Sequence, residues 1–256
     1  FLTYLFNLLG VMAVFGWDKE RSTISIRVPA LALADVKFRH SAYELVALIF
    51  ISVVMFDGIL ETPFWKAILE FITYSQGLRP FLIDIKGWGV DILKCTETLG
   101  LVLLIGVWWI LFRGLCWCMW LISSRENEKR DISLRFAVSL LPIAIAYHLA
   151  HYISYLLLAG QLIFPIISDP FAVGWDLFGT RTQRIDIGVV NAENVWWIAA
   201  SAVVMGHILS VFTGHLLAVK FFKTRRQVIL SQIPLAFFMV ILTMSSLWIL
   251  SQPIVN

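Results

Sequence analysis

The stretch Ala146-Tyr147-His148-Leu149-Ala150-His151-Tyr152 lies in the middle of an apolar segment that runs from about Phe136 to Pro165. This segment is long enough to cross a bilayer, which takes about 20 residues in a helix. Its two histidines are three residues apart, so on an α-helix they lie one turn from each other on the same side. Ionisable groups are costly inside a bilayer, and two of them on one helix face therefore predict a polar partner.

The whole chain shares this apolar character. Its 256 residues are 59% hydrophobic and 14% charged, with a mean hydropathy of +0.83, whereas a soluble domain is roughly half apolar and a quarter charged. The composition predicts an all-α polytopic membrane protein, with one transmembrane helical domain over residues 1–256. Its expected partner is the lipid bilayer, with other membrane subunits as further candidates and no nucleic acid. Because residue 1 is a Phe inside an apolar run, we expect this sequence to be the later part of a longer chain.

The apolar runs predict six membrane-crossing helices and one interfacial helix. The runs assigned to membrane helices are 1–16, 42–60, 99–122, 136–165, 195–222 and 228–250. The run 64–74 has an apolar stripe, which is typical of a helix that lies flat in the membrane interface.

The basic residues predict the orientation of the chain. They are concentrated in the short links 17–40, 123–135 and 220–227, which alternate along the chain and so share one side of the membrane. Lys and Arg in short loops mark the cytoplasmic side. We therefore expect these links to face the cytoplasm, and both ends of this sequence to lie outside.

Polar side chains from three predicted helices lie at a similar depth. Counted from the cytoplasmic helix ends, Asp57, His151 and His207 are each about 13 to 15 residues in, or roughly 20–22 Å at 1.5 Å per residue. His148 is one turn lower than His151, and Glu61 is one turn above Asp57 on nearly the same face. This level is in the outer half of the bilayer, within reach of a substrate from the outer leaflet or the periplasm.

Imidazoles and carboxylates at one depth are the ligand set of a divalent metal ion such as zinc or iron. The predicted metal ligands are Asp57, His148, His151 and His207. A bound cation would also explain why a carboxylate is tolerated inside a bilayer. The predicted catalytic residues are Glu61 and Asp57, one of which orients or deprotonates a metal-bound water. The alternative to a metal or catalytic site is a structural role, in which these groups hydrogen-bond one another and hold the helices together.

Two other functions remain open on the same residues. Haem b between the fourth and fifth helices would use His148 and His215 as cofactor-binding residues, with room for the porphyrin beside Gly206 and Gly214. The protein would then be a haem-carrying or accessory subunit of a membrane redox complex. In an ion-coupled transporter, the same polar groups would bind an ion or relay protons.

Several stretches carry a resemblance to a known family. They are Phe56–Trp65, Ala146–Tyr152, Ser168–Thr180, Gly206-His207 and Leu247–Val255. These stretches resemble bacterial integral membrane proteins labelled fenitrothion hydrolase, and the resemblance covers most of the chain beyond about residue 42. It implies cleavage of an organophosphate ester and residence in the bacterial cytoplasmic membrane, and it supplies no catalytic residues. The favoured prediction is therefore a membrane-embedded, metal-dependent hydrolase acting on phosphoester-like substrates.

Overall fold

The computed structural model describes residues 2–18, 22–27, 30–35, 40–122, 129–189 and 191–252. In this part of the chain, five helical spans are long and apolar enough to cross a membrane. They are α2 (Ala42–Leu60), α5 (Ile92–Ile122), a composite span over Ile132–Ser168, α9 (Ala192–Phe221) and α10 (Arg225–Ser251). The composite span contains the end of α6 (Lys129–Ala137), all of α7 (Leu141–Ala159) and all of α8 (Ile163–Ser168), joined by short 3-10 turns. The predicted all-α polytopic membrane fold is confirmed.

The first predicted helix is shorter than expected. The apolar helix α1 (Leu2–Val11) has 10 residues, and Phe15 and Gly16, predicted as its end, instead begin strand β1 (Phe15–Asp18). This strand pairs antiparallel with β2 (Thr23–Ile26), whose alternating Thr-Ile-Ser-Ile sequence favours a strand. The described chain therefore has five membrane-length spans where the sequence predicted six.

Three long helices begin before the apolar runs that predicted them, because polar side chains cap them. Asp91 accepts hydrogen bonds from two backbone N–H groups at the start of α5, at 3.0 and 3.3 Å. Asn191 does the same at the start of α9, and Thr224 and Gln227 form a reciprocal capping box at the start of α10. These side chains satisfy backbone donors that a helix start otherwise leaves unpaired.

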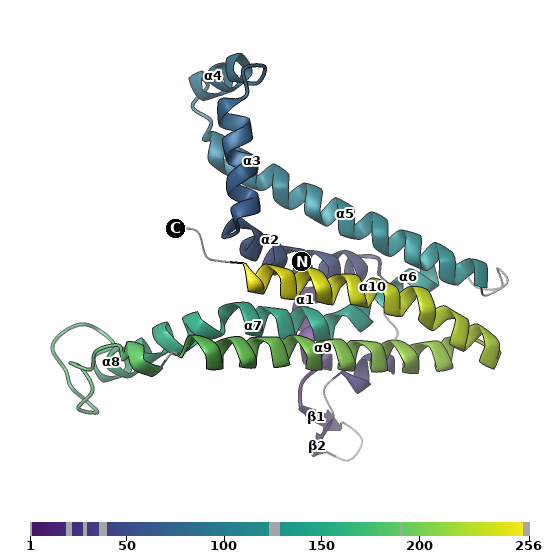
Figure 1. Ribbon diagram of the computed structural model, residues 1–256. Helices are drawn as coiled ribbons and strands as arrows, with labels where there is room; N and C mark the ends of the chain where they lie inside the picture. Colours follow the sequence, from purple (N-terminus) through teal and green to yellow (C-terminus); the bar gives the residue numbers. More distant parts are fainter. Residues whose placement is uncertain are drawn as a thin grey trace.

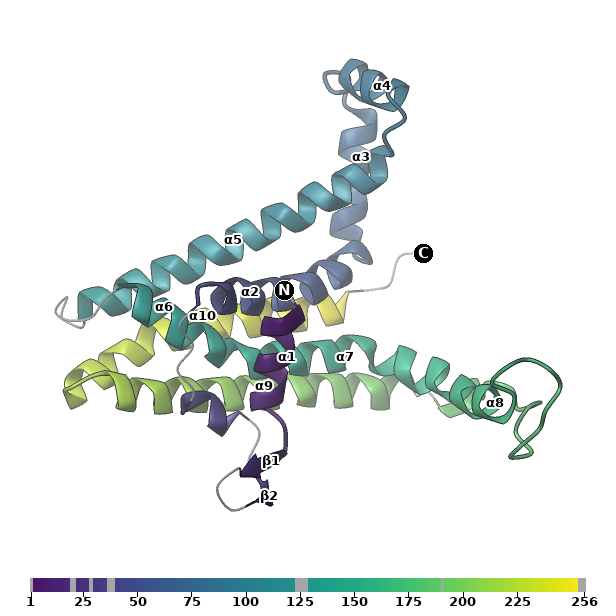
Figure 2. The same cartoon turned by 180° about the vertical axis from the view of Figure 1, so that it is seen from behind.

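The predicted interfacial helix corresponds to α3 (Pro63–Tyr74). Thr62 caps it by accepting a hydrogen bond from the backbone N–H of Trp65 at 3.4 Å, and Pro63 fits the first turn. This helix runs across the direction of the long helices in both ribbon views (Figure 1 and Figure 2). That is the orientation expected of a helix along a bilayer surface. A short helix that the sequence did not predict, α4 (Arg79–Gly87), follows it.

The histidine stretch belongs to α7, which lies in the middle of the bundle between α2 and α9 (Figure 1). Its span is the most buried of the five. Glycines let neighbouring helices approach closely: a Cβ on Gly206 of α9 would stand 2.3 Å from Cβ of Ala146 on α7. A Cβ on Gly58 of α2 would stand 2.6 Å from a methyl carbon of Ile249 on α10. Close backbone approach at small residues is typical of packed membrane helices.

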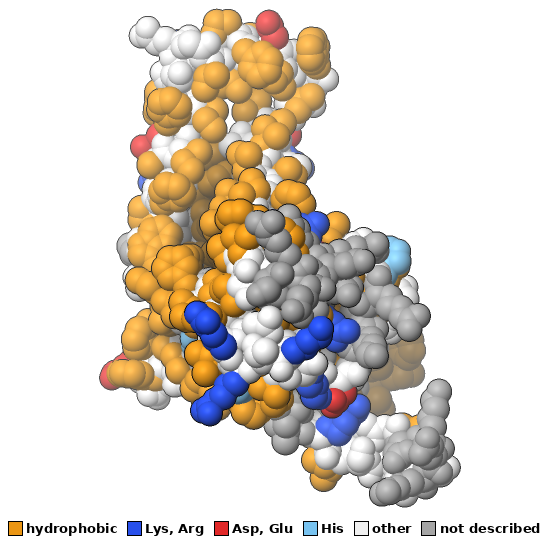
Figure 3. All heavy atoms as spheres, turned by 90° about the vertical axis from the view of Figure 1, so that its right-hand side faces the viewer, with side chains coloured by type: hydrophobic (Ala, Val, Ile, Leu, Met, Phe, Trp, Pro, Cys, Tyr) orange, Lys and Arg blue, Asp and Glu red, His pale blue; other side chains and the backbone are white. Residues whose placement is uncertain are grey.

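One end of the bundle is basic. The α9–α10 junction lies at this end (Figure 1), and Lys and Arg side chains gather on it (Figure 3). Lys220 pairs here with Asp35. Parts of the other two predicted cytoplasmic links fall outside the described residues, including Lys19, Arg21, Lys37, Arg39 and Arg125. Lys and Arg gathered at one end are compatible with the predicted orientation, which stays a prediction.

Cysteine labelling tests this orientation in a variant in which Cys95, Cys116 and Cys118 are replaced by Ala. A membrane-impermeant maleimide applied from outside should label a new cysteine at Thr182 and should leave one at Ser124 unlabelled, because the basic links face the cytoplasm. Permeabilising the membrane should then allow both positions to react. Labelling of Ser124→Cys alone from outside would show that the basic end faces outward.

A buried ionic network lies near the basic end. Glu44, in the first turn of α2, is only 5% exposed. It accepts a hydrogen bond from Ser133 of α6 at 2.7 Å, and its other oxygen lies 3.5 Å from Nε of Arg113 on α5. Arg113 also donates to the Ser133 hydroxyl at 3.1 Å. Hydrogen bonds through Ser133 and the ion pair between Arg113 and Glu44 therefore tie α2, α5 and α6 together.

Two aspartates order the connection between α8 and α9. Asp169 accepts hydrogen bonds from the backbone N–H groups of Val173 and Gly174, at 3.0 and 2.9 Å. Ser168 donates to Asp176 at 2.7 Å, and this hydrogen bond holds the pKa of Asp176 below its usual value. Both carboxylates therefore stabilise turns of this loop, which is a common use of Asp.

Candidate functional site

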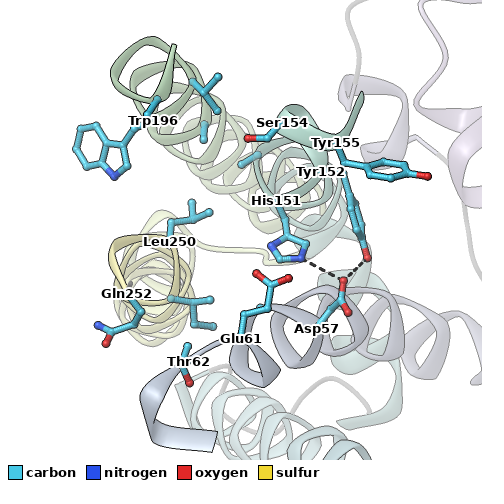
Figure 4. A pocket seen from close by; sticks show the side chains of 16 residues that line it. Asp57, Glu61, Thr62, His151, Tyr152, Ser154, Tyr155, Trp196, Leu250 and Gln252 are labelled. Carbon is cyan, nitrogen blue, oxygen red and sulfur yellow. Dashed lines mark hydrogen bonds and ion pairs between the residues drawn. The ribbon is translucent and has the colours of Figure 1, made fainter. Parts of the chain in front are cut away.

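A cavity of about 570 Å³ opens at the end of the bundle opposite the basic end. Its wall is formed by the last residues of α2 and α10, the first residues of α9 and the second half of α7 (Figure 4). The side chains that matter most in the wall are Asp57, Glu61, His151, Tyr152, Tyr155 and Trp196. This volume is within the usual range for sites that take small molecules.

Asp57 is the centre of the polar side of this cavity. Its Oδ2 accepts a hydrogen bond from the Tyr152 hydroxyl at 2.6 Å and lies 3.1 Å from Nε2 of His151 (Figure 4). The His151 side chain is 11% exposed and that of Asp57 is 44% exposed, so the wall holds the imidazole while the carboxylate meets the cavity. An ionised carboxylate only accepts hydrogen bonds, so Asp57 keeps a proton on Nε2 and leaves a lone pair on Nδ1.

Glu61 follows Asp57 by one helical turn and faces the same cavity. Figure 4 shows its carboxylate directed toward the His151 ring. Within the described chain, the Glu61 carboxylate has no hydrogen bond or ion pair, and no Lys or Arg is among the described residues of the wall. The two carboxylates therefore give the cavity a negative potential.

Of the four predicted metal ligands, the structure brings together Asp57 and His151. His148 lies elsewhere: its ring stacks on that of Phe50 with centroids 4.1 Å apart, and its Nδ1 is 2.9 Å from the carbonyl oxygen of Ala144. A hydrogen bond to the backbone of its own helix and a stacked phenyl ring are the surroundings of a packed residue.

The other histidines are also outside the cavity wall. Nδ1 of His207 lies 2.8 Å from the hydroxyl oxygen of Thr243 on α10, and His215 is exposed. In the part of the chain that the structure describes, no three His, Cys, Asp or Glu side chains are grouped so as to hold a metal ion. The predicted ligands therefore do not form one shell, because a shared depth ignores the direction in which each side chain leaves its helix.

The room expected for a porphyrin is filled by neighbouring helices. A Cβ added to Gly206 would clash with α7, and one added to Gly214 would stand 2.6 Å from a methyl carbon of Leu235 on α10. Both glycines are points of close helix contact rather than gaps. The exposed His215 and the stacked His148 consequently do not fit as axial ligands of one haem between α7 and α9.

Two tyrosines next to the histidines were not predicted as site residues. Tyr152 donates to Asp57, and Tyr147 is fully buried with a hydroxyl that has no hydrogen-bond partner among the described residues. That hydroxyl would lie 3.2 Å from a Cβ on Gly58, which is part of the cavity wall. Tyrosines in membrane helices are mostly packing or interface residues, so the one signal in the sequence was that Tyr152 adjoins His151 at the depth of Asp57.

Comparison of the chain with protein-family models, with curated proteins and with solved structures finds no match. The resemblance to proteins labelled fenitrothion hydrolase therefore stays an expectation. What the protein does is inferred from the chemistry of the cavity.

Proposed function

We propose that the protein is a membrane-embedded hydrolase of esters that carry no negative charge, with His151 as the general base and Asp57 as the residue that orients it. The observation that carries the proposal is the contact between Asp57 and His151 in the wall of a cavity of small-molecule size. A histidine whose tautomer is fixed by a carboxylate is the usual arrangement for general-base catalysis.

In this reaction, a water molecule in the cavity gives a proton to Nδ1 of His151 while its oxygen attacks the carbonyl or phosphoryl centre of the ester. The bond to the leaving group then breaks, and the proton passes from the imidazolium to the departing oxygen. Asp57 stabilises the imidazolium between these two transfers. Tyr152 binds the same carboxylate oxygen and so limits its rotation.

The charge of the cavity decides the kind of ester. Asp57 and Glu61 would repel a phosphomonoester or another anion, and the described wall has no Lys or Arg to offset them. A neutral phosphotriester or carboxylic ester meets no such repulsion. Apolar wall residues such as Ala199, Ile249 and Leu250 suit the hydrocarbon part of the substrate. The resemblance implies an organophosphate ester, and the neutral triester form of such an ester fits these requirements.

The proposed reaction does not use the zinc or iron ion predicted from the sequence, because the described His, Cys, Asp and Glu side chains do not gather around one point. Water activation rests on His151 alone. The haem alternative has no step either, since the space beside Gly206 and Gly214 is filled.

Hydrolysis of matched chromogenic esters tests the proposal. Purified protein in lipid nanodiscs should release nitrophenol from a neutral nitrophenyl carboxylic ester or phosphotriester and should leave nitrophenyl phosphate intact, because the cavity repels anions. We expect this activity to survive a metal chelator. Cleavage of the anionic ester alone would contradict the proposal.

The same preparation also tests the predicted cofactors. Elemental analysis and a visible absorption spectrum would detect a bound metal ion or haem. Stoichiometric zinc or iron that is lost together with activity on chelation, and lost in His151→Ala but kept in His215→Ala, would support the metal-dependent hydrolase instead.

An ion-coupled transporter is the second candidate, and the unpaired carboxylate of Glu61 favours it. Carboxylates inside a membrane bundle often bind a cation or relay protons. Proteoliposomes that carry a proton or cation flux without cleaving either ester would support the transporter over the hydrolase.

A further inference from the structure

We propose that an anionic phospholipid binds at the basic end of the bundle, with its headgroup at Arg225 and Arg226 and an acyl chain along the outer face of α10. These two arginines are the first residues of α10, and both are exposed. The cavity lies at the opposite end of the bundle, so this site does not depend on the proposed hydrolysis.

The first argument is that the two arginines have no partner of opposite charge. Nearby, Lys220 of α9 is paired with Asp35. The side chains of Arg225 and Arg226, in contrast, make no ion pair or hydrogen bond with any residue that the structure describes. They belong to the end of the molecule at which Lys and Arg side chains gather (Figure 3). Their charges are therefore available to an external anion.

The second argument is the place of these charges on their helix. The N-terminus of an α-helix carries a partial positive charge, so acidic side chains are favourable there and basic ones are unfavourable. The first turn of α10 nevertheless has two arginines and no acidic residue. Thr224 and Gln227 cap this helix by hydrogen-bonding each other's backbone N–H groups, so the helix end itself needs no further partner. The repulsion that remains favours an anion from outside the chain.

The third argument is an apolar stripe that begins at these arginines. Side chains four residues apart are neighbours on a helix surface. Ile229, Ile233 and Phe237 follow Arg225 at this spacing, and they are 54%, 64% and 69% exposed. The distance along the axis from Arg225 to Phe237 is about 18 Å at 1.5 Å per residue. This is slightly more than half of the hydrocarbon core of a bilayer, which is about 30 Å thick, so the stripe has the length of one acyl chain.

The continuity of the charged and apolar parts favours a lipid over a soluble anion. Since α10 is a membrane-length span, its exposed stripe faces hydrocarbon and its basic end lies at the level of the headgroups. Anionic headgroups attract Lys and Arg side chains at this level. A guanidinium group can also donate two parallel hydrogen bonds to phosphate oxygens. An anionic phospholipid satisfies both parts of the surface at once.

Thermal unfolding of the detergent-solubilised protein tests the proposal with lipids that differ only in headgroup. Phosphatidylglycerol is anionic, and phosphatidylcholine with the same acyl chains has no net charge. Phosphatidylglycerol should raise Tm in a saturable way that gives a Kd, and phosphatidylcholine should not. Glycerol 3-phosphate has a similar anionic group without acyl chains, so at the same concentrations it should leave Tm unchanged.

Two double variants make the comparison specific. Arg225→Gln/Arg226→Gln should raise the Kd of phosphatidylglycerol by roughly 25-fold, at about fivefold for each basic residue near an anionic surface. Without lipid, its Tm should equal or slightly exceed that of the parent, because unfavourable charges leave the helix N-terminus. Arg79→Gln/Lys86→Gln removes the same charge from exposed positions of α4, and it should leave the Kd unchanged.

Equal stabilisation by the two phospholipids, or the same rise in Kd for both double variants, would overturn the proposal. Saturable stabilisation by glycerol 3-phosphate at the concentrations at which phosphatidylglycerol acts would also overturn it, because the site would then take a free anion. Stabilisation by phosphatidylglycerol alone, weakened in the α10 variant and kept in the α4 variant, would support it.

Discussion

Replacement of His151 by Gln is expected to lower kcat for ester hydrolysis by about 10²–10⁴-fold, which is the usual contribution of a general base. Gln is similar in size and its amide can still donate to Asp57, so the cavity wall should keep its shape. It has no basic nitrogen, however, and cannot take the proton of the attacking water. The measurement is the steady-state rate in nanodiscs, with Tm as the check that the variant is folded.

The matched control for this variant is His215→Gln. His215 is on α9, where it is exposed and outside the cavity wall, so its replacement should change the rate by less than about twofold, as surface substitutions usually do. A His151→Gln protein that keeps the full rate would remove His151 from the reaction. A similar loss in both variants would show that the effect is not local to the cavity.

Replacement of Gly206 by Leu is expected to cost the folded state about 3 kcal/mol or more, at or above the upper end of the usual cost of overpacking a core. Its Cβ alone would stand 2.3 Å from Ala146 Cβ and 2.9 Å from the backbone oxygen of Pro142. A backbone oxygen cannot move aside as a flexible side chain can, so α7 and α9 must separate. The measurements are the yield of folded protein and its Tm.

Gly106 provides the control, because it is a membrane-helix glycine on α5 with nothing within 4 Å of its added Cβ. Gly106→Leu should fold with nearly the parental Tm. The same drop in Tm for both variants would show that leucine at any helix glycine is damaging, and would contradict the close α7–α9 contact.

The membrane fold could be predicted from the sequence because long apolar runs have one stable form in a bilayer, the helix. Predictions failed where a different interaction decides the structure. Phe15–Asp18 form a strand because they pair with Thr23–Ile26. The apolar run at the start of the sequence gives no indication of this pairing. Capping side chains start three helices several residues before the apolar runs from which these helices were predicted. The capping residues are Asp91, Asn191 and Thr224.

The site could be predicted in part for a similar reason. Depth along a helix follows from residue number, and it placed Asp57 level with His151, where the structure has them 3.1 Å apart. The direction of a side chain around its helix depends on packing, which is why His207 lies against Thr243 and His148 against Phe50. The role of Tyr152 was missed because tyrosines in membrane helices are mostly packing or interface residues, although Tyr152 donates to the same Asp57 oxygen that His151 contacts.

The most direct test of the central claim is whether Asp57 and His151 act as one unit in hydrolysis. The measurement is kcat for Asp57→Asn, His151→Gln and the double variant, compared with the parent protein. Residues that serve one catalytic step are not additive, so the double variant should be about as slow as His151→Gln alone. If instead the two losses multiply, the two residues act independently and the carboxylate–histidine base is not the centre of the reaction.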